Sequence, residues 1–385
     1  MKILIALTYY RPHISGLTIY AERIAKAFAR RGHEVTVLTS RYDKALPREE
    51  VQDGVRIVRA PIWFRLSKGV IMPSFYFLAA KLARENDAVQ IHLPQFESAW
   101  MAFLGRILRK PTVITYHCDL LMPPGLLNWV ANQAVCLMNI FAAIFTHRIV
   151  TYTEDYAKHS RFLASYKRKS SYILPPVELP EVTDEEIQRF RQDFNPDNRK
   201  PVIGMAARLA TEKGVEVLLE ALPSVIRVFP KALVLFAGPY QNIVGEQEYY
   251  QRLMPLIQRY EVNGHWRFVG TLNPRQMATF YPNLDVLVLP SLNSTEAFGL
   301  VQIEAMINGV PVIASDLPGV RQPVIMHEMG RIIPIGNSAA LSAALIDILQ
   351  GGKQDSTKCI EIARRYMSDT VAQAYEQLFA DCKIS

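Results

Sequence analysis

Short apolar segments recur along the first half of the chain, separated by segments whose apolar residues follow a helical period. Lys2–Leu7 and Val35–Thr39 are apolar runs of strand length. Between them, Thr18–Arg31 carries apolar residues at helical spacing, and Gly32 marks the end of that helix. This β-loop-α-β beginning is typical of a doubly wound α/β domain. Further strands are predicted at Val55–Val58, Val89–His92, Thr112–Tyr116, Ile149–Tyr152 and Tyr172–Leu174.

The alternation begins again after a proline cluster at Pro175–Pro180, which we take as a domain boundary. An acidic helix is predicted at Asp184–Phe194, and a terminal helix is predicted at Ser356–Cys382. The pattern therefore predicts two Rossmann-like α/β domains, residues 1–178 and 179–365, with a cleft between them. The strands predicted for the second domain are Pro201–Met205, Leu233–Ala237, Trp266–Val269, Asp285–Leu289 and Pro311–Ala314.

A chain of 385 residues is too long for one ordinary core, which agrees with two domains. Hydrophobic residues make up 50% of the chain, which favours a packed globular protein over a disordered one. The apolar run after Met1 is short and lacks a cleavage site of small residues, so it predicts a strand rather than a secretion signal. No uninterrupted apolar stretch is long enough to predict a membrane-spanning helix. The four cysteines are far apart and predict free thiols in a reducing cytoplasm: Cys118, Cys136, Cys359 and Cys382.

The net charge of +7 is distributed unevenly along the chain. Residues 1–175 contain 24 Lys and Arg against 12 Asp and Glu, a balance of +12, and the remainder contains 19 against 24, a balance of −5. A basic first half suggests an anionic partner surface, and the alternative is a solvated basic face without a partner. Nucleic acid is disfavoured as the partner because no nucleic-acid-binding motif accompanies the charge.

Glu296 and Glu304 follow the apolar run that ends at Leu289. The pattern predicts a strand, a loop that carries Glu296, and a short helix that begins near Phe298 and Gly299 and carries Glu304. A carboxylate between two apolar elements is costly without a partner, so a pair of ordinary solvated residues is the weaker interpretation. The two carboxylates could flank a glycosidic bond, as in hydrolases, or each could hold a different part of a sugar nucleotide.

Two cations follow the first strand of the second domain. Arg208 comes just after the strand that ends near Met205, and Lys213 precedes Gly214 and a helical segment. Cations at the carboxyl end of a strand and beside a helix start can bind a diphosphate. Ordinary charges on a surface loop are the alternative interpretation of this segment.

Two positions in the first domain are further candidates. Gly16 lies in the loop before the first helix, where a glycine allows the backbone to approach a phosphate or a sugar. The loop lacks the GxGxxG pattern, which disfavours a nicotinamide or flavin cofactor. His117 follows the strand Thr112–Tyr116, at the strand end where α/β domains bind ligands, although a lone histidine there is often structural.

Together these motifs resemble the retaining, nucleotide-sugar-dependent glycosyltransferases of the GT-B fold, family four, also called glycosyl transferases group 1. The resemblance spans nearly the whole chain, and its most specific part is the stretch with the two glutamates. Ser15 and Ala207 stand where the family often has glycine. The residues that carry the resemblance are Met1–Leu4, Pro12 with Gly16, Arg31–Val37, Thr115–Asp119, Arg208 with Lys213 and Gly214, Glu296–Leu300 with Glu304 and Ala305, and Gly309–Ala314.

The resemblance implies a role for each matching residue. Arg208 and Lys213 would neutralise the donor diphosphate, and Glu304 would hold the ribose hydroxyls. Glu296 would bind hydroxyls of the donor sugar near the reacting carbon, and His117 would contact that sugar in a position often described as catalytic. The remaining donor-binding positions are Gly16, which would line the phosphates, and the backbone amides of Phe298, Gly299 and Leu300, which would meet sugar and phosphate oxygens.

The resemblance also implies an activity and a division of labour. A hexosyl group would pass from a nucleotide-diphosphate sugar to an acceptor hydroxyl with retention of anomeric configuration. Residues 179–365 would bind the donor, the first domain would bind the acceptor, and a terminal helix at 366–385 would pack back on the first domain. Fixed cations and helix amides would stabilise the leaving diphosphate, so neither a metal nor another cofactor is expected. The open alternatives are a catalytically silent sugar-nucleotide-binding protein and a nucleotide-sugar epimerase of GT-B type.

The segment Leu126–His147 is unusually apolar for a basic domain. Its polar residues Asn128, Asn132, Asn139 and Thr146 fall on one narrow stripe of a helix. The segment could be an interfacial helix on an anionic leaflet, and a core helix or a dimer face is equally compatible. A lipid-linked acceptor, or a glycan precursor of the cell envelope, would account for both the charge and the apolar surface. We therefore expect a cytoplasmic protein, and peripheral attachment to the cytoplasmic face of the membrane is one of the open interpretations.

Overall fold

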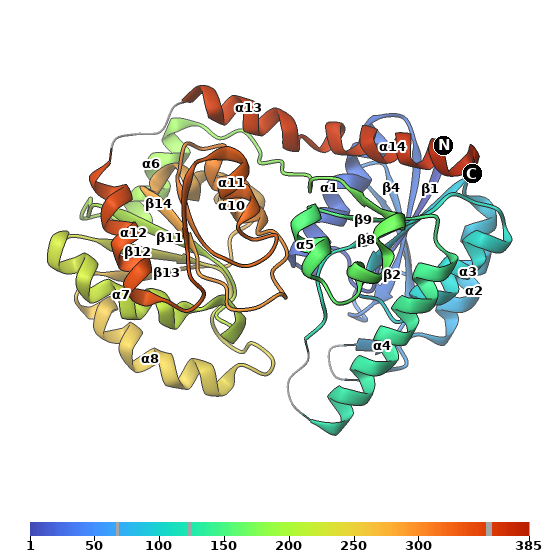
Figure 1. The fold of residues 1–385 in the computed structure, drawn as a ribbon, viewed down its shortest axis with the longest axis horizontal. Coiled ribbons are helices and arrows are strands. Elements are labelled where there is room, and N and C mark those ends of the chain that lie inside the picture. The colour runs from blue at the N-terminus through green and yellow to red at the C-terminus, as the bar shows by residue number, and fades with distance from the viewer. Residues whose placement is uncertain (67–68, 122–124, 352–355, 385) are drawn as a thin grey trace. The chain divides into compact units, whose positions relative to one another are not determined.

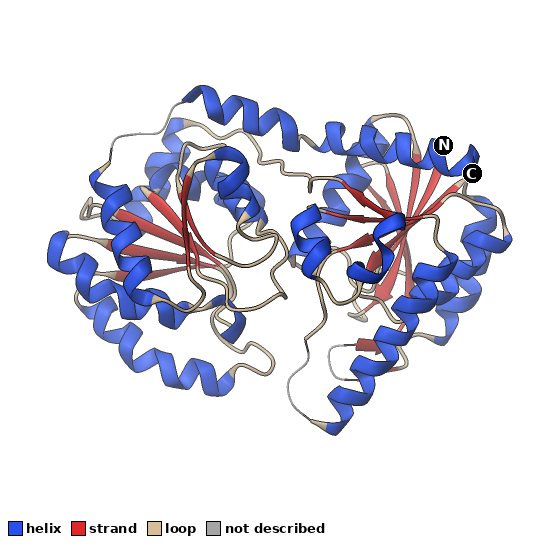
Figure 2. Ribbon diagram, viewed as in Figure 1, coloured by secondary structure: helices blue, strands red, loops and turns tan. Residues whose placement is uncertain are grey.

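The computed structural model describes residues 1–66, 69–121, 125–351 and 356–384. Contacts divide the chain into two compact units: Met1–Val177 together with Tyr366–Ser385, and Glu178–Arg365. Each unit contains a mainly parallel sheet with helices packed on its faces (Figures 1 and 2). The predicted α/β class is confirmed in both units.

The sheet of the first unit has eight strands in the order β10-β9-β8-β7-β1-β2-β4-β3. Only the β3–β4 pair is antiparallel among the pairs of this sheet that the structure describes. β5 and β6 form a separate antiparallel hairpin. The strands are β1 (Lys2–Ala6), β2 (Glu34–Arg41), β3 (Glu49–Gln52), β4 (Val55–Pro61), β5 (Phe64–Leu66), β6 (Gly69–Ile71), β7 (Ala88–Leu93), β8 (Thr112–Tyr116), β9 (Arg148–Thr151) and β10 (Ser170–Tyr172).

The helices of the first unit cover its sheet. α14 packs against α1 and β8, and α3 packs between α2 and α4. The helices are α1 (Gly16–Arg30), α2 (Pro73–Glu85), α3 (Ser98–Ile107), α4 (Leu126–Phe145), α5 (Glu154–His159), the 3-10 helix η1 (Leu163–Lys169) and α14 (Ser368–Ile384). The single terminal helix expected over Ser356–Cys382 is wrong, because α13 ends at Tyr366, where the chain enters the first unit, and a separate helix, α14, begins at Ser368.

The sheet of the second unit is parallel throughout, in the order β13-β12-β11-β14-β15-β16. Its strands are β11 (Val202–Ala206), β12 (Leu233–Ala237), β13 (Trp266–Gly270), β14 (Val286–Leu289), β15 (Val312–Ser315) and β16 (Gly330–Ile333). Its helices are α6 (Asp184–Phe194), η2 (Thr211–Lys213), α7 (Val215–Val228), α8 (Gln247–Val262), α9 (Pro274–Phe280), η3 (Tyr281–Asn283), α10 (Leu300–Met306), α11 (Gln322–His327), α12 (Ser338–Gln350) and α13 (Ser356–Tyr366).

The strand order of each sheet reverses at one place. In the second unit the chain moves outward in one direction from β11 to β13 and in the other direction from β14 to β16. In the first unit the corresponding change lies between β1 and β7. Open α/β sheets bind ligands beyond the carboxyl ends of their strands at such a switch point. We therefore expect a ligand-binding site in the loops that follow β1, β7, β11 and β14.

α4 departs from the sequence expectations. The 18-residue window Asn128–Phe145 is long and apolar enough, by length and composition, to cross a membrane, whereas the sequence pattern predicts no such helix. Only 17% of this window is buried inside the structure. The interpretation of this segment as a core helix is therefore wrong.

Candidate active site

The loop after β11 lies directly against the loop after β14. Gly214, at the end of η2, has a φ of +65°, and a Cβ atom there would lie 2.1 Å from the carbonyl oxygen of Pro290. The amide of Leu292 donates to the carbonyl oxygen of Glu212 at 2.9 Å. Only glycine permits this approach, because any side chain at 214 would collide with fixed backbone. The close contact brings two distant stretches of sequence together at the switch point.

Lys213 and Glu296 form a direct ion pair in this place, with 2.7 Å between Nζ and Oε2. Their side chains are only 16% and 20% exposed, so each charge is poorly hydrated and depends on the other. Arg208 is more open, at 47% exposed, and pairs with the carboxylate of Glu212. Each cation of the predicted diphosphate clamp therefore holds a carboxylate. The sequence motifs place these cations but do not predict their partners.

The loop that carries Glu296 is ordered by a side-chain turn. The amide and the hydroxyl of Thr295 both donate to Oδ1 of Asn293, at 3.1 and 2.7 Å. The amide of Glu296 donates to the carbonyl oxygen of Asn293 at 3.3 Å. Asparagine side chains replace backbone acceptors in turns of this kind. The Glu296 carboxylate is thus presented on a fixed loop just beyond β14.

Gly299 connects this loop to α10, which begins at Leu300, as the short helix expected near Phe298 and Gly299. Gly299 has a φ of +79°, and a Cβ atom there would lie 2.4 Å from Cδ2 of Leu289 and 2.9 Å from Nε2 of Gln302. Gln302 is fully buried, and its Nε2 donates to the carbonyl oxygen of Phe298 at 2.6 Å. The backbone that precedes α10 is therefore locked by a glycine and a buried amide.

Glu304 lies one turn into α10 and is buried. The hydroxyl of Tyr281, a fully buried side chain, donates to Oε2 of Glu304 at 2.6 Å. A buried carboxylate held by a hydroxyl has a fixed direction, because rotation of its side chain would break the bond. The structure therefore places Glu296 and Glu304 on one loop-helix segment with separate partners, Lys213 and Tyr281.

Gly16 begins α1, and Ser15 caps that helix. The hydroxyl of Ser15 accepts from the amide of Thr18 at 3.2 Å, and the amide of Ser15 donates to the Thr18 hydroxyl at 2.8 Å. Serine is a favoured residue at this position because its oxygen satisfies a free amide of the first turn. This capping explains how serine can stand where the family often has glycine. A Cβ atom at Gly16 would meet nothing within 4 Å, so the local fold does not itself require glycine there.

His117 follows β8 and is only 5% exposed. Its Nε2 lies 2.8 Å from Nδ1 of His92, and its Nδ1 is hydrogen-bonded to the hydroxyl of Tyr152. Burial, and then His92, hold the pKa of His117 well below the usual range of an imidazole. Burial alone lowers the pKa of His92 to about 3. His117 is therefore a neutral imidazole with both ring nitrogens engaged by protein groups.

The partners of His117 belong to a larger buried network that the sequence motifs do not reveal. The hydroxyl of Tyr375, from α14, lies 2.7 Å from that of Tyr20 and 2.8 Å from that of Thr115. The ring of Tyr20 packs edge-on against His117, with 5.0 Å between ring centroids. The sequence contains one indication of this network. His92 is a polar residue near the end of β7, an otherwise largely apolar strand that pairs with β8. Such a histidine needs a buried partner, and the end of β8 supplies one.

Glu97 is a second residue that the sequence reasoning missed. It follows β7 at the switch point of the first sheet, precedes α3, and is 3% exposed. Burial raises the pKa of Glu97 to about 7, although its own backbone and Gln95 partly oppose the shift. A carboxyl that titrates near neutrality at a switch point has the properties of a functional group. The short polar stretch after an apolar strand was the only sequence signal.

Glu97 also makes the stability of the protein depend on pH. Because its folded-state pKa lies above its usual value of 4.5, the neutral carboxyl stabilises the fold fully below about pH 4.5, and this contribution is lost as the pH rises through about 7. The variant Glu97→Gln should therefore be more stable than wild type at pH 8 by up to about 3 kcal/mol, and no more stable near pH 4.5. Thermal unfolding at both pH values tests this expectation, with the exposed Glu181→Gln as the matched control. Equal differences at both pH values would contradict it.

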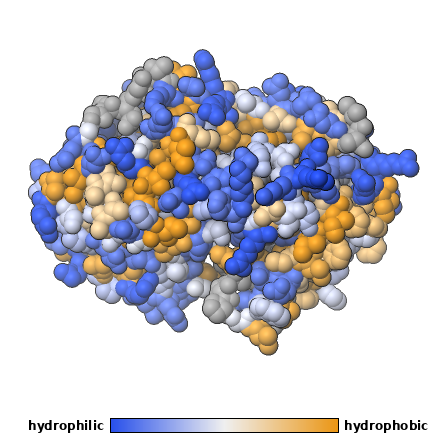
Figure 3. Space-filling view, in the orientation of Figure 1, coloured by the Kyte–Doolittle hydropathy of each residue, from blue (hydrophilic) through white to orange (hydrophobic). Residues whose placement is uncertain are grey.

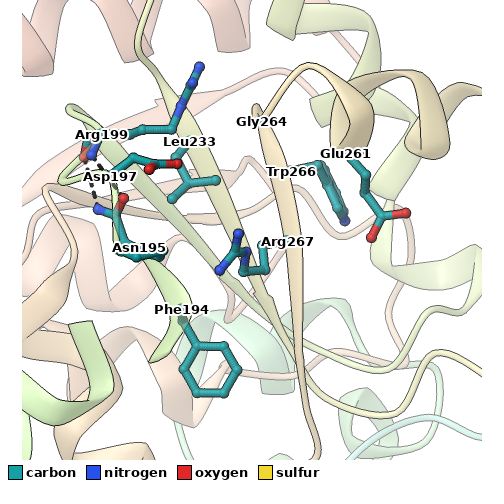
Figure 4. A pocket seen from close by; sticks show the side chains of 10 residues that line it. Phe194, Asn195, Asp197, Arg199, Leu233, Glu261, Gly264, Trp266 and Arg267 are labelled. Atoms are coloured by element: carbon teal, nitrogen blue, oxygen red, sulfur yellow. Dashed lines mark hydrogen bonds between the residues drawn. The ribbon is translucent and has the colours of Figure 1, made fainter. Parts of the chain in front are cut away.

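A pocket of about 230 Å3 lies elsewhere in the second unit (Figure 4). It is lined by residues at the amino ends of β12 and β13, including Leu233 and Trp266, and by Asn195 and Arg199. Asn195 and Arg199 are joined there by two hydrogen bonds, of 3.0 and 2.8 Å. None of the predicted site residues lines this pocket, and ligand sites of parallel sheets lie at the opposite strand ends. We therefore assign it no part in the candidate site.

Within the described ranges, no group of three or more His, Cys, Asp or Glu side chains is arranged to hold a metal ion. The predicted residues of the second unit converge at its switch point: Arg208, Lys213, Glu296, Phe298, Gly299, Leu300 and Glu304. Gly16 and His117 lie beyond the carboxyl ends of β1 and β8 in the first unit. In each unit the candidate residues thus follow the carboxyl ends of the strands, where parallel sheets bind ligands.

Comparisons with known proteins bear on the whole chain. The model of the family "Glycosyl transferases group 1" matches residues 186–366, and that of the "Glycosyl transferase 4-like domain" matches residues 15–171. An uncharacterised glycosyltransferase of Methanocaldococcus jannaschii is 26% identical over 86% of this chain and 84% of its own length. The phosphatidyl-myo-inositol mannosyltransferase of Mycolicibacterium smegmatis is 25% identical over 87% and 81%. The crystal structure of HepE from Anabaena in complex with UDP is similar with a TM-score of 0.77, at 20% identity over 99% of this chain and 100% of that one.

Proposed function

Because the chain belongs to the group 1 glycosyltransferases and has the GT-B fold, we propose that it transfers a hexosyl group from a nucleotide-diphosphate sugar to an acceptor hydroxyl with retention of configuration. The observation that carries the proposal is the ion pair of Lys213 and Glu296 at the switch point of the second sheet, where the loop after β11 also carries Arg208. A diphosphate leaving group needs fixed positive charge, and a sugar needs fixed hydrogen-bond acceptors. This place supplies both.

The ion pair suggests how the donor enters the site. Lys213 is neutralised by Glu296, and Arg208 is neutralised by Glu212. A diphosphate would compete with these carboxylates for the two cations, and hydroxyls of the sugar would replace Lys213 as hydrogen-bond partners of Glu296. We propose that the pairs hold the cations in place before binding, so that little side-chain entropy is lost when the donor arrives.

Glu304 has the character of a binding group. Its carboxylate is buried and directed by Tyr281. We propose that it accepts hydrogen bonds from the ribose hydroxyls, while the backbone from Phe298 to Leu300 meets sugar and phosphate oxygens through its amides. The buried amide of Gln302 holds that backbone in place.

His117 fits the role of a neutral contact residue better than that of a general base. It is neutral, and both of its ring nitrogens are engaged. We propose that His117 contacts the donor sugar as a neutral group, oriented by His92 and Tyr152. The proton of the acceptor hydroxyl would pass to the leaving phosphate as the glycosidic bond breaks, and the new bond would form on the same face of the sugar. No side chain then has to change its protonation state.

Acceptor binding is proposed for the first unit, where Glu97 lies at the switch point of the sheet. A carboxyl with a pKa near 7 can donate or accept a hydrogen bond to a hydroxyl acceptor at neutral pH. We propose a lipid-linked acceptor or a glycan precursor of the cell envelope, used by a protein at the cytoplasmic face of the membrane. The basic charge of residues 1–175 and the name of the mycobacterial relative, a phosphatidyl-myo-inositol mannosyltransferase, support this choice.

A panel of nucleotide sugars tests the donor part of the proposal. UDP-, GDP- and ADP-sugars are added one at a time, and thermal unfolding and release of the nucleoside diphosphate are measured. A true donor at about 100 times its Kd should stabilise the protein by about 2.7 kcal/mol and should be hydrolysed slowly without acceptor. Glu304→Ala should reduce the stabilisation, because the ribose loses its acceptor, while Glu328→Ala, an exposed residue of the same unit, should leave it unchanged.

Two other outcomes of the panel would point elsewhere. Stabilisation without any release of nucleoside diphosphate, with every acceptor tried, would favour a silent sugar-nucleotide-binding protein. Conversion of one nucleotide sugar into its epimer would favour an epimerase. No stabilisation by any member of the panel would contradict the assignment of the donor site.

A further inference from the structure

The outward face of α4 is mostly apolar and is interrupted by the exposed Gln133. Its exposed residues recur at helical spacing, and Trp129 is 61% exposed. Figure 3 shows hydrophobic residues over the upper part of the place where Figure 1 draws α4 and again at its lower tip. The exposed large apolar side chains of the helix are Leu126, Trp129, Val130, Leu137, Ile140, Phe141 and Ile144. A large exposed apolar face of this kind marks a surface that contacts an apolar partner when the protein functions.

The polar stripe of the same helix turns inward. Asn139 and Thr146 are buried, and the hydroxyl of Thr146 donates to the carbonyl oxygen of Thr112 at 2.8 Å. Near its end α4 also packs on α3, where the rings of Phe103 and Phe145 are 5.4 Å apart. The helix is therefore amphipathic in the reverse sense from an ordinary surface helix. Asn139 and Thr146 of the stripe face the protein, and most of the large apolar residues face outward.

Basic residues gather at the carboxyl end of α4. The ammonium group of Lys169 donates to the carbonyl oxygens of Ala143, Ile144 and Thr146 at 2.8 to 2.9 Å and so caps the helix. Arg106 and Arg148 lie close enough to add to the lowering of the pKa of Lys169 that burial causes.

No described carboxylate forms an ion pair with this group of cations, which also includes the exposed Lys167 and Arg168. The cations near α4 therefore offer their charge to an external anion.

The topology decides between a helix that spans a bilayer and one that lies on it. β8 and β9 are parallel neighbours in one sheet, and α4 connects them. Only Thr146 and His147 separate α4 from β9. If α4 spanned the bilayer, the return connection would cross the hydrocarbon as unpaired backbone, which lipid does not tolerate. The helix can therefore lie in the plane of one leaflet and cannot cross it.

We propose that α4 is an in-plane membrane helix, whose outward face enters the acyl-chain boundary of an anionic leaflet while the cations at its carboxyl end contact lipid phosphates. An apolar face calls for an apolar partner, and the adjacent uncompensated positive charge selects an anionic bilayer over an uncharged protein surface. Trp129 would sit at the interface, where tryptophan is favoured. The inference deepens the proposed function by naming the surface at which the acceptor is met, and the binding itself needs neither donor nor acceptor.

The experiment measures binding of the full chain to vesicles without nucleotide sugar. One set of vesicles is phosphatidylcholine alone, and the other contains about a third of phosphatidylglycerol. The face variant combines Trp129→Gln, Leu137→Gln and Ile144→Gln, and the matched control combines Val228→Gln, Val262→Gln and Ile360→Gln on exposed apolar positions of the second unit. The charge variant combines Arg106→Gln, Lys167→Gln and Arg168→Gln, and it spares the capping Lys169.

We expect wild type and the control to bind anionic vesicles and the face variant to bind at least tenfold more weakly. Each cation removed in the charge variant should weaken vesicle binding about fivefold. High salt should also weaken vesicle binding, because it screens the attraction between the cations and the anionic lipid. Brominated lipids should quench the tryptophan fluorescence of wild type, and Trp129→Phe should remove that quenching. Hydrolysis of the donor in solution should be equal for all variants, which separates this inference from the proposed activity.

Three results would overturn the inference. Wild type could fail to bind vesicles of either composition, or the face variant could bind as well as wild type. Alternatively, wild type could form a dimer in solution that the face variant breaks, in which case a second copy of the chain covers α4. Circular dichroism and thermal unfolding verify that the face variant is folded, which is expected because all three positions are exposed.

Discussion

Replacing Lys213 with alanine should lower kcat/KM for glycosyl transfer by about 10²- to 10³-fold, the range found when one donor to a developing anion is removed. Two effects act in the same direction. The leaving diphosphate loses a cation that is held in a largely desolvated position, and Glu296 loses its ion-pair partner. Steady-state kinetics with the donor identified by the panel measures the loss. The exposed Lys231→Ala is the matched control, and it should behave as wild type.

A double variant separates the two effects. If the loss in Lys213→Ala comes only from the unpaired carboxylate of Glu296, then Glu296→Gln combined with Lys213→Ala should recover much of the activity, because glutamine carries no charge. If Lys213 acts on the diphosphate, the double variant should stay as inactive as Lys213→Ala alone. We expect the second result. The free-energy effects of the two substitutions should not add, because the two residues are in contact. A Lys213→Ala enzyme with the wild-type rate would remove this residue from the donor site.

Replacing Gly299 with alanine should destabilise the second unit and abolish donor binding. A Cβ atom at this position would lie 2.4 Å from Leu289 and 2.9 Å from the buried amide of Gln302, in a backbone conformation with φ of +79°. The conformation alone costs about 1–3 kcal/mol for a residue other than glycine. Removal of the clash requires movement of β14 or of the Gln302 side chain, which holds Phe298. Thermal unfolding and donor titration measure both consequences.

Gly245 provides the control for this experiment. Its φ is +84°, close to that of Gly299, but a Cβ atom there would meet nothing within 4 Å. Gly245→Ala should therefore show only the conformational cost and should still bind donor. The difference in stability and in donor affinity between the two variants measures the effect of the close contacts around Gly299. Equal effects at both positions would mean that the contacts around Gly299 contribute nothing.

The strands were largely predictable because buried parallel strands are continuous apolar runs. β8 at Thr112–Tyr116 and β12 at Leu233–Ala237 have the predicted bounds. The short edge strands were not predictable, since β3 at Glu49–Gln52 is polar and almost wholly solvated. The break between α13 and α14 also left no local signal, because neither glycine nor proline marks it. The position of the break follows from tertiary packing, because α13 packs in the second unit and α14 packs in the first.

The site was only half predictable, for a different reason. Residue types and positions after strands pointed to Arg208, Lys213, Glu296 and Glu304, but sequence gave no partner for any of them. Lys213 and Glu296 are 83 positions apart, and their contact depends on the order of strands in the sheet. His92 was missed because it lies inside a strand that reads as core. Its role follows only once β7 and β8 are known to be neighbours.

The connection between the two units affects the order in which they can form during translation. The first unit is discontinuous: its chain leaves at Val177 and returns at Tyr366, whose carbonyl oxygen accepts from the amide of Val177 at 2.8 Å. The returning helix supplies the fully buried Tyr375 and Phe379. The second unit, by contrast, is one uninterrupted stretch. On the ribosome, the second unit is therefore the first whose whole sequence has emerged, and the amino-terminal unit must wait for the last helix before its core can close.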